Sequence, residues 1–160
     1  MPRFVPILLL AVLLAGCNRN STVGLVGTKA PDFTIKDSDR TVSLHDFKGK
    51  TVLLNFWATN CPPCVEEMPS LVRLQKLKGP GLVVLAVSTD QSEQEYHRFL
   101  QRYSIDILTV RDAARKSPDL YLTTGQPETF VIDSSGMVRR KFWGPVDWTS
   151  KEVLDYLSKL

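Results

Sequence analysis

Two cysteines stand one helical turn apart at the end of a strongly apolar segment. Residues 51–56 form a short and almost continuously apolar run, which is typical of a central strand covered on both faces. Cys61-Pro62-Pro63-Cys64 follows it after a brief turn. Pro62 suits the first position of a helix, because an N–H there would have no helical partner in any case. The chain is therefore predicted to pass from a buried strand into a helix that carries both thiols.

The predicted start of this helix favours ionisation of the first thiol. Cys61 is expected at the helix cap, where the positive end of the helix dipole and the N–H groups of Cys64 and Val65 face its sulfur. These partial charges stabilise a thiolate, which is the attacking species in disulfide exchange. Cys64 is placed to attack Cys61 in turn. We therefore take Cys61 as the candidate nucleophile and Cys64 as the candidate resolving thiol of a redox-active pair.

The same Cys-x-x-Cys spacing also forms half of a zinc site, so the other ligands decide between the two interpretations. A structural zinc site takes four ligands. The sequence holds one further cysteine, Cys17, while His45 and His97 each stand without a second ligand at metal spacing. We therefore predict no metal, and disulfide exchange by two thiols needs no cofactor.

Composition indicates one ordinary globular domain. The chain has 160 residues, of which 43% are hydrophobic and 23% charged. The net charge of +3 is small and dispersed, with no basic helix and no basic face interleaved with aromatic residues. We therefore expect no nucleic acid as a partner.

The first residues differ in kind from the rest. Arg3 precedes a run of twelve apolar residues, 4–15. As a helix such a run rises only about 18 Å, which is short of the roughly 30 Å hydrocarbon layer of a membrane. Residues 1–16 are therefore predicted to be a signal peptide.

Leu14-Ala15-Gly16-Cys17 resembles the lipobox of bacterial lipoproteins. This resemblance implies cleavage before Cys17, a lipid on that residue, and an exported protein anchored to a bacterial membrane. The alternative is plain secretion with an incidental Cys17. Residues 17–29 read as a flexible tether and residues 30–160 as the domain, and either route places the thiol pair where disulfides persist.

Apolar patterning predicts a mixed α/β sheet with helices on both faces. Beyond the strand at 51–56, we expect a hairpin from 33–35 and 41–44, a strand at 82–87, a short extended segment at 105–110, and a second hairpin from 129–132 and 137–142. Helices are expected from Pro62 to the Gly79-Pro80-Gly81 stop, over 92–103 and 150–160, with a helical turn at 117–122.

Several motifs in one order resemble the thioredoxin superfamily, and within it the exported TlpA/ResA/DsbE-like thiol-disulfide oxidoreductases. The motifs are Ala30-Pro31-Asp32-Phe33, Lys48-Gly49-Lys50, Leu54-Asn55-Phe56-Trp57-Ala58-Thr59, Cys61-Pro62-Pro63-Cys64, Pro69 and the run from Gly125 to Asp133. The resemblance implies a thioredoxin fold with an N-terminal β-hairpin and a central insertion at about 89–124.

The resemblance also implies a substrate-binding loop. Pro127 matches the position where the family carries a cis proline beside the cysteine pair. A cis bond would turn the backbone of Gln126 outward, where it could pair with an extended substrate segment. Trp57 is retained as a candidate substrate contact, although we expect it mainly to pack beneath the site.

Three positions near the pair depart from or refine the family pattern. Thioredoxin keeps a buried Asp where this chain has Asn55. Glu67 matches an acidic residue of the exported branch, and we hypothesise that it is buried, has a raised pKa and serves as acid/base for Cys64. The alternative is that Glu67 is a solvent-exposed carboxylate on the helix, like Glu66. Asn60 replaces the usual Trp before the first cysteine, which opens the candidate substrate surface.

The predicted function is reduction of disulfides in exported proteins, for example during cytochrome c maturation, with electrons from a membrane reductant of the DsbD/CcdA type. One alternative is a thiol peroxidase of the peroxiredoxin type, but Leu54 and Ala58 stand where its Pro and Thr would be. Another is a copper-binding chaperone, which would need His45, His97 or a Met brought close to the thiols by folding.

Overall fold

A five-stranded mixed sheet forms the centre of the computed structural model, which describes residues 24–160. The strand order is β5-β4-β3-β6-β7, with β3, β4 and β5 parallel and β6 and β7 antiparallel to their neighbours. The strands are Thr51–Trp57 (β3), Leu82–Ser88 (β4), Leu108–Arg111 (β5), Glu128–Ile132 (β6) and Val138–Trp143 (β7). The predicted thioredoxin fold is confirmed.

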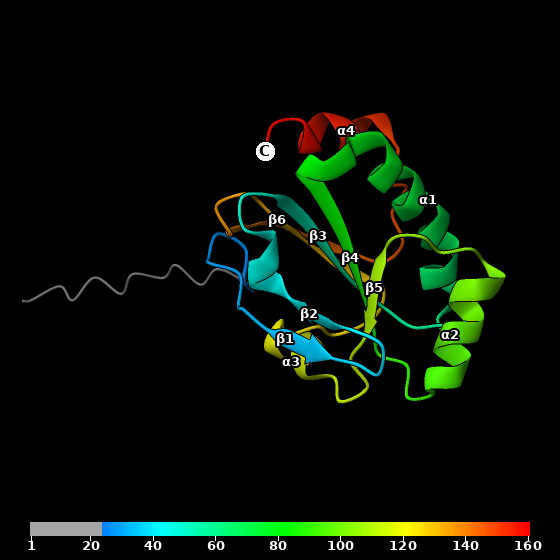
Figure 1. Ribbon diagram of the computed structural model, residues 1–160. Coiled ribbons are helices and arrows are strands. Elements are labelled where there is room, and N and C mark those ends of the chain that lie inside the picture. The colour runs from blue at the N-terminus through cyan, green and yellow to red at the C-terminus, as the bar shows by residue number, and fades with distance from the viewer. Residues whose placement is uncertain (1–23) are drawn as a thin grey trace, which may run out of the picture.

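Three of the four α-helices cover one face of this sheet, and the N-terminal hairpin with the short helix Lys116–Leu120 covers the other (Figure 1). The α-helices are Pro62–Lys78 (α1), Glu93–Arg102 (α2), Lys116–Leu120 (α3) and Lys151–Leu157 (α4). Side chains of α1, α2 and α4 share one apolar cluster. The hairpin of Thr34–Lys36 (β1) and Thr41–Ser43 (β2), the 3-10 helix Leu44–Phe47 (η1) and Tyr121 after α3 pack on the opposite face.

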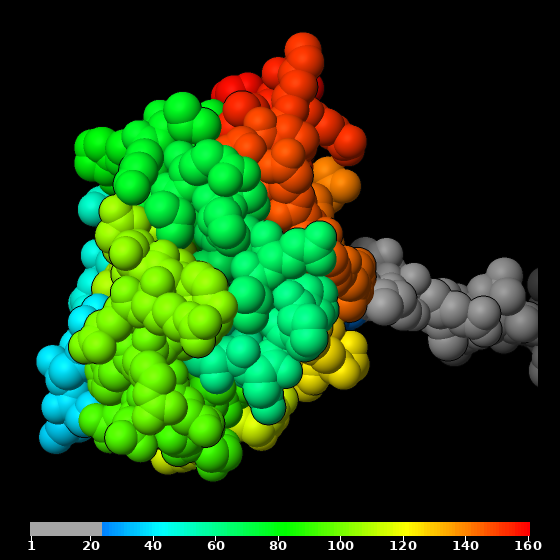
Figure 2. Space-filling view, turned by 90° about the vertical axis from the view of Figure 1, so that its right-hand side faces the viewer, coloured from blue at the N-terminus to red at the C-terminus, as the bar shows by residue number. Residues whose placement is uncertain are grey.

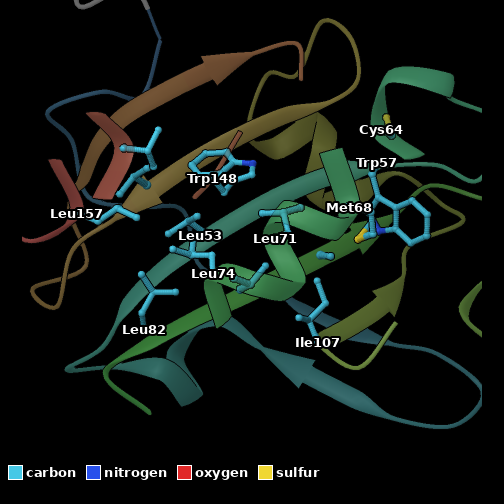
Figure 3. Packing of buried hydrophobic residues seen from close by; sticks show 14 of the residues in the cluster. Leu53, Trp57, Cys64, Met68, Leu71, Leu74, Leu82, Ile107, Trp148 and Leu157 are labelled. Atoms are coloured by element: carbon cyan, nitrogen blue, oxygen red, sulfur yellow. The ribbon is translucent and has the colours of Figure 1, made fainter. Parts of the chain in front are cut away.

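The two apolar clusters explain why β3 is apolar along nearly its whole length. Leu53 and Trp57 point into the cluster under α1, whereas Leu54 and Phe56 point toward the hairpin. Figure 3 shows Leu53 and Trp57 among the side chains of the first cluster. Alternate side chains of a strand face opposite sides of the sheet, so a strand covered on both sides needs apolar residues at every position.

Local signals set the limits of α1 as predicted. Pro62 occupies the first position, and Cys61 is the N-cap in an extended conformation. Gly79 ends the helix with φ +61°, a conformation that glycine adopts without the steric cost of a Cβ. The short 3-10 helix Gly79–Gly81 (η2) then leads into β4. The two cysteines are therefore held on the first turn of a helix of ordinary length.

The boundary of the N-terminal tether is a correction. Gly27 N–H donates to the carbonyl of Val138 (2.8 Å), and Val138 N–H donates to the carbonyl of Thr28 (2.9 Å). Lys29 forms an isolated bridge with Met137. Residues 24–29 of the predicted 17–29 tether thus lie on the domain, because the free edge of β7 offers partners to their backbone. The predicted signal peptide and Cys17 lie outside the described residues.

Membrane-spanning helices were sought over residues 24–160. No helix in this part of the chain has both the length and the apolar character needed to cross a bilayer.

Candidate active site

A disulfide joins Cys61 and Cys64 at the start of α1, with the two Cα atoms 5.3 Å apart. Cys61 is partly exposed, whereas Cys64 is buried with 1% of its surface accessible. The N–H of Cys64 lies 3.3 Å from Cys61 Sγ and donates to it. The N–H of Val65, also expected to face that sulfur, instead donates to the carbonyl of Cys61 (3.1 Å) as in a regular helix. One backbone donor and the helix dipole therefore favour negative charge on Cys61.

A buried carboxylate, Asp90, holds the turn between β3 and Cys61. Thr59 donates to it twice, from its backbone N–H (3.1 Å to each oxygen) and from its hydroxyl (2.7 Å). Ser88 Oγ donates to the other carboxylate oxygen at 2.6 Å. Sequence reasoning missed Asp90, although a signal was present, because polar residues directly after an apolar parallel strand lie at the same sheet edge as the end of its neighbour.

The peptide bond between Gln126 and Pro127 is cis, as the resemblance predicted. Phe56 pairs with Glu128 across the sheet, which places Pro127 beside Trp57 at the end of β3. The side chain of Gln126 points inward, because Nε2 donates to the carbonyl of Trp57 (3.2 Å) and to Thr89 Oγ1 (2.8 Å). Its backbone is therefore the part of Gln126 that is free to act as a substrate contact.

The turn after β4 braces the cysteine loop against the proline loop. Thr89 N–H donates to the carbonyl of Trp57 (3.0 Å) and its hydroxyl accepts from Gln126, while the adjacent Asp90 binds Thr59. Figure 2 shows the start of α1 at the surface between the segment near residues 120–125, in yellow, and the segment that follows β7, in orange. Three loops from separate parts of the sequence thus meet around the disulfide.

Glu67 lies inside the protein one helical turn after Cys64, with 3% of its surface accessible. Its Oε1 accepts from Asn55 Nδ2 (2.7 Å), and its Oε2 accepts from the backbone N–H of Val146 (2.9 Å). Burial raises the pKa of Glu67 to about 7, and the hydrogen bonds from Val146 and Asn55 oppose that shift. The hypothesis of a buried carboxyl with a raised pKa therefore agrees with the structure, while its role toward Cys64 stays a proposal.

Asn55 occupies the position at which thioredoxin keeps a buried Asp. Its Nδ2 donates both to Glu67 and to Thr129 Oγ1, the latter at 2.8 Å. The amide thus serves as a donor that fixes the carboxylate of Glu67, and the acid of this site is supplied by the helix rather than by the strand.

The side chain of Trp57 is buried beneath the site, as mainly expected, which argues against its place among the candidate substrate-binding residues. Its side chain has no exposed surface and packs against Phe99 and Tyr96, with ring centroids 5.3 and 6.3 Å away. A side chain that does not reach the surface cannot meet another protein. Asn60 is exposed directly before Cys61, so it stays a candidate for substrate contact.

A third buried carboxylate near the site, Glu128, follows the cis proline and was not singled out from the sequence. Its Oε1 accepts from the N–H and hydroxyl of Thr124 (3.1 and 2.9 Å), and its Oε2 lies 2.8 Å from Lys141 Nζ. Glu128 therefore ties the loop before Pro127 to β7. An acidic residue inside an otherwise apolar strand was the available sequence signal.

The histidines lie in other surroundings. His45 stands 3.4 and 3.2 Å from the carboxylates of Asp32 and Asp46, and His97 stands 3.8 Å from Glu93. Within residues 24–160, no three His, Cys, Asp or Glu side chains gather as metal ligands. The two histidines named for the copper-chaperone alternative thus lie beside carboxylates and do not join the thiol pair in a cluster of this kind.

Comparison with known proteins gives one consistent result. The chain is 34% identical to the thiol-disulfide oxidoreductase ResA of Bacillus subtilis over 134 residues, covering 82% of this chain and 74% of ResA. It is 38% identical to the thioredoxin-like protein YneN of the same organism over 131 residues, 79% of this chain and 75% of YneN. A structure from Chlorobium tepidum, assigned as a DsbE thiol:disulfide interchange protein, superposes with a TM-score of 0.75 at 30% identity, covering 82% of this chain and 94% of that one.

The sheet, the disulfide at the start of α1 and the adjacent cis proline define a thioredoxin-like thiol-disulfide oxidoreductase. The model of the AhpC/TSA family matches residues 26–141. This chain belongs to the AhpC/TSA family, with ResA, YneN and DsbE-like proteins as its relatives.

Proposed function

We propose that this enzyme reduces disulfides of exported proteins outside the cytoplasm. The arrangement that carries the proposal is a partly exposed Cys61 and a buried Cys64, disulfide-bonded at a helix start beside the Pro127 loop. A substrate can reach only the first sulfur readily, which sets the order of the two thiols. The cycle begins with both cysteines reduced.

The Cys61 thiolate attacks one sulfur of the substrate disulfide. A bond forms between Cys61 and that sulfur, the substrate disulfide breaks, and the other substrate sulfur leaves as a thiolate that takes a proton from water. Cys64 then attacks Cys61 Sγ and releases the second substrate thiolate, which is protonated in turn. The substrate gains two electrons and two protons, and the enzyme ends with the Cys61–Cys64 disulfide.

Glu67 is proposed to accept the proton of Cys64 as that thiol attacks. Both side chains are buried, and Glu67 follows Cys64 by one turn of α1. A carboxyl whose pKa is about 7 is close to half ionised at neutral pH, so it can take up a proton and return it. Cys64 is buried, so its proton cannot pass directly to bulk water. The buried carboxylate of Glu67 is therefore proposed as the acceptor.

Substrate recognition is assigned to the backbone before Pro127. The Gln126 side chain is held inward by two hydrogen bonds, so its peptide groups lie at the rim with a fixed orientation. An extended substrate segment would pair with them in the manner of an added strand. Asn60, which is exposed directly before Cys61, would be a small polar neighbour of the substrate disulfide that Cys61 attacks.

The proposed setting follows from the first residues of the sequence. Export and a lipid on Cys17 would hold the enzyme at a bacterial membrane, within reach of a membrane thiol reductant of the DsbD/CcdA type that restores the dithiol. Exported proteins with paired cysteines are its proposed substrates, for example apocytochromes c before haem attachment.

Two experiments test this function. Purified protein should reduce insulin disulfides in the presence of a thiol reductant, and Cys61→Ser should abolish that activity. In cells, Cys64→Ala should trap exported substrates as mixed disulfides with Cys61, because the resolving thiol is missing. Normal insulin reduction by Cys61→Ser would contradict the assignment. Trapped complexes that persist when Cys61→Ser is combined with Cys64→Ala would contradict it as well.

A further inference from the structure

A pocket of about 460 Å³ opens at the end of the sheet away from the cysteine pair. Three lysines line it, Lys29, Lys48 and Lys50, together with η1 and the turn 133–136 between β6 and β7. All three lysines are exposed. Nothing in the proposed reaction uses them, so their clustering calls for a separate explanation.

The charges around this pocket are not balanced within the described part of the chain. None of the three lysines forms an ion pair with a residue of 24–160. Of the two acidic residues that line the pocket, Asp133 is bound to Arg139, and Asp32 lies 3.4 Å from His45. His45 carries charge only when protonated, so Asp32 offsets one of the three lysine charges, and the lining keeps an excess of positive charge.

This face lies opposite the active site. Lys50 directly precedes β3, whereas Cys61 follows the other end of the same strand. Seven residues of strand separate the two ends, a span of about 20 Å. Figure 1 shows the blue segment after residue 24 beside η1 and the β6–β7 turn, with the first turn of α1 at the far end of the sheet.

The chain itself indicates what covers this face. Cys17, the proposed lipid attachment site, precedes Gly24 by seven residues, so a lipid there lies at most about 25 Å from Gly24. Gly27 and Thr28 are bonded to Val138 of β7, and Lys29, which bridges Met137, is part of the pocket wall. A bilayer that holds the lipid would therefore lie within reach of the face that carries these lysines.

We infer that Lys29, Lys48 and Lys50 form a docking face for an anionic bilayer surface, which holds the domain with its cysteine pair directed away from the membrane. The reach argument rests on the proposed anchor, whereas the charge argument stands without it. A lysine near an anionic membrane contributes about a fivefold gain in affinity, and the effect is confined to roughly a Debye length. At about fivefold each, three lysines would together raise the affinity for an anionic surface by about a hundredfold, and salt would weaken that gain.

Vesicle sedimentation tests this surface without the lipid. The mature chain from residue 17, carrying Cys17→Ser, should bind vesicles that contain phosphatidylglycerol and ignore vesicles of phosphatidylcholine alone. Changing all three lysines to Gln should weaken this binding by about 10- to 100-fold. The matched control changes Lys36, Lys116 and Lys159 to Gln, which removes the same charge from exposed positions elsewhere and should leave affinity within about threefold.

Each outcome has a defined meaning. Equal losses in the two triple variants would overturn the docking face, because they would reflect net charge alone. Binding of glycerol phosphate in solution with no preference for anionic vesicles would also overturn it, in favour of a free anion as ligand. Mass spectrometry of Cys17 from a membrane fraction tests the anchor separately, so an unmodified Cys17 would refute the lipoprotein proposal and leave the vesicle result intact.

Discussion

Asn55 Nδ2 donates a hydrogen bond of 2.7 Å to Glu67 Oε1 in a region where neither side chain has appreciable contact with solvent. The donor comes from the central strand and the acceptor from the helix that carries the thiols. An amide at this strand position satisfies a buried carboxyl without adding a second negative charge beneath the disulfide. This pairing leads to the first two predictions.

Glu67 should make the oxidised protein less stable as pH rises. Its pKa in the folded protein is about 7, against an ordinary value of 4.5, so the folded state holds the proton more tightly than the unfolded state does. Its stabilising contribution is complete below about pH 4.5 and is lost as pH rises through 7. Between about pH 5 and pH 8, the unfolding free energy of the wild type, measured with urea, should fall by about 2–3 kcal/mol more than that of Glu67→Gln. The exposed neighbour gives the control, Glu66→Gln, which should behave as the wild type does.

Glu67 should also shape the reactivity of Cys64. Once Glu67 is ionised, its negative charge opposes formation of the Cys64 thiolate, so Glu67→Gln should lower the apparent pKa for alkylation of Cys64 by about one unit or more. The measurement uses reduced protein with Cys17→Ser and Cys61→Ser, so that a single thiol reports. An identical pH profile with and without the carboxyl would discard Glu67 as acid/base.

Asp90 should control the placement of Cys61. Asp90→Asn weakens a carboxylate that accepts from both groups of Thr59 and from Ser88, and we expect a loss of about 1–3 kcal/mol in unfolding free energy. We also expect slower insulin reduction with a shifted pH profile of Cys61 alkylation, because the loop before the thiol loses its support. Thr59→Val removes the hydroxyl bond alone and should have a smaller effect. Full activity and an unshifted profile in Asp90→Asn would contradict this placement role.

Breaking the pair formed by Glu128 and Lys141 should cost far more stability than breaking an exposed ion pair. Lys141→Ala leaves the buried Glu128 carboxylate without its cation and should cost about 3–5 kcal/mol in unfolding free energy. Lys151→Ala breaks a pair with Asp155 on the surface of α4 and should cost less than about 1 kcal/mol. Chemical unfolding of both variants provides the comparison. Equal losses of unfolding free energy in Lys141→Ala and Lys151→Ala would contradict this prediction and would show that water reaches Glu128.

Combining Glu128→Gln with Lys141→Met separates charge from packing. The double variant removes both charges and keeps side chains of similar size, so most of the stability lost in Lys141→Ala should return. The loop before Pro127 would still lose its charged anchor at Glu128, so insulin reduction should recover less fully than stability does.

Much of the fold followed from local patterns. The apolar run in β3, Pro62 at the start of α1 and Gly79 at its end act over a few residues, and the structure confirms the strand and helix that they predict. The hairpins also match their predicted places within one or two residues. Short-range rules suffice here because backbone geometry and burial on both faces of the sheet act on each segment separately.

The tether boundary shows where local patterns failed, whereas the burial of Trp57 agrees with the packing mainly expected for it. Residues 24–29 have the composition of a flexible linker, yet they bond to β7, a strand more than one hundred residues later in the chain. Trp57 stands four residues before Cys61, yet its side chain lies wholly within the core under α1. For residues 24–29 the deciding partner lies far away in the sequence, where no local pattern can indicate it.

The sequence by itself determined that two thiols lie on the first turn of a helix after a buried strand, because spacing, Pro62 and helix capping are local. Only the tertiary structure decided which acidic side chain is buried near them. Glu66 and Glu67 are neighbours of the same chemical type, but packing against Asn55 and Val146 buries one and leaves the other in water. Burial depends on contacts between distant segments, and it is burial that moves the pKa of Glu67 into the range where it can exchange a proton.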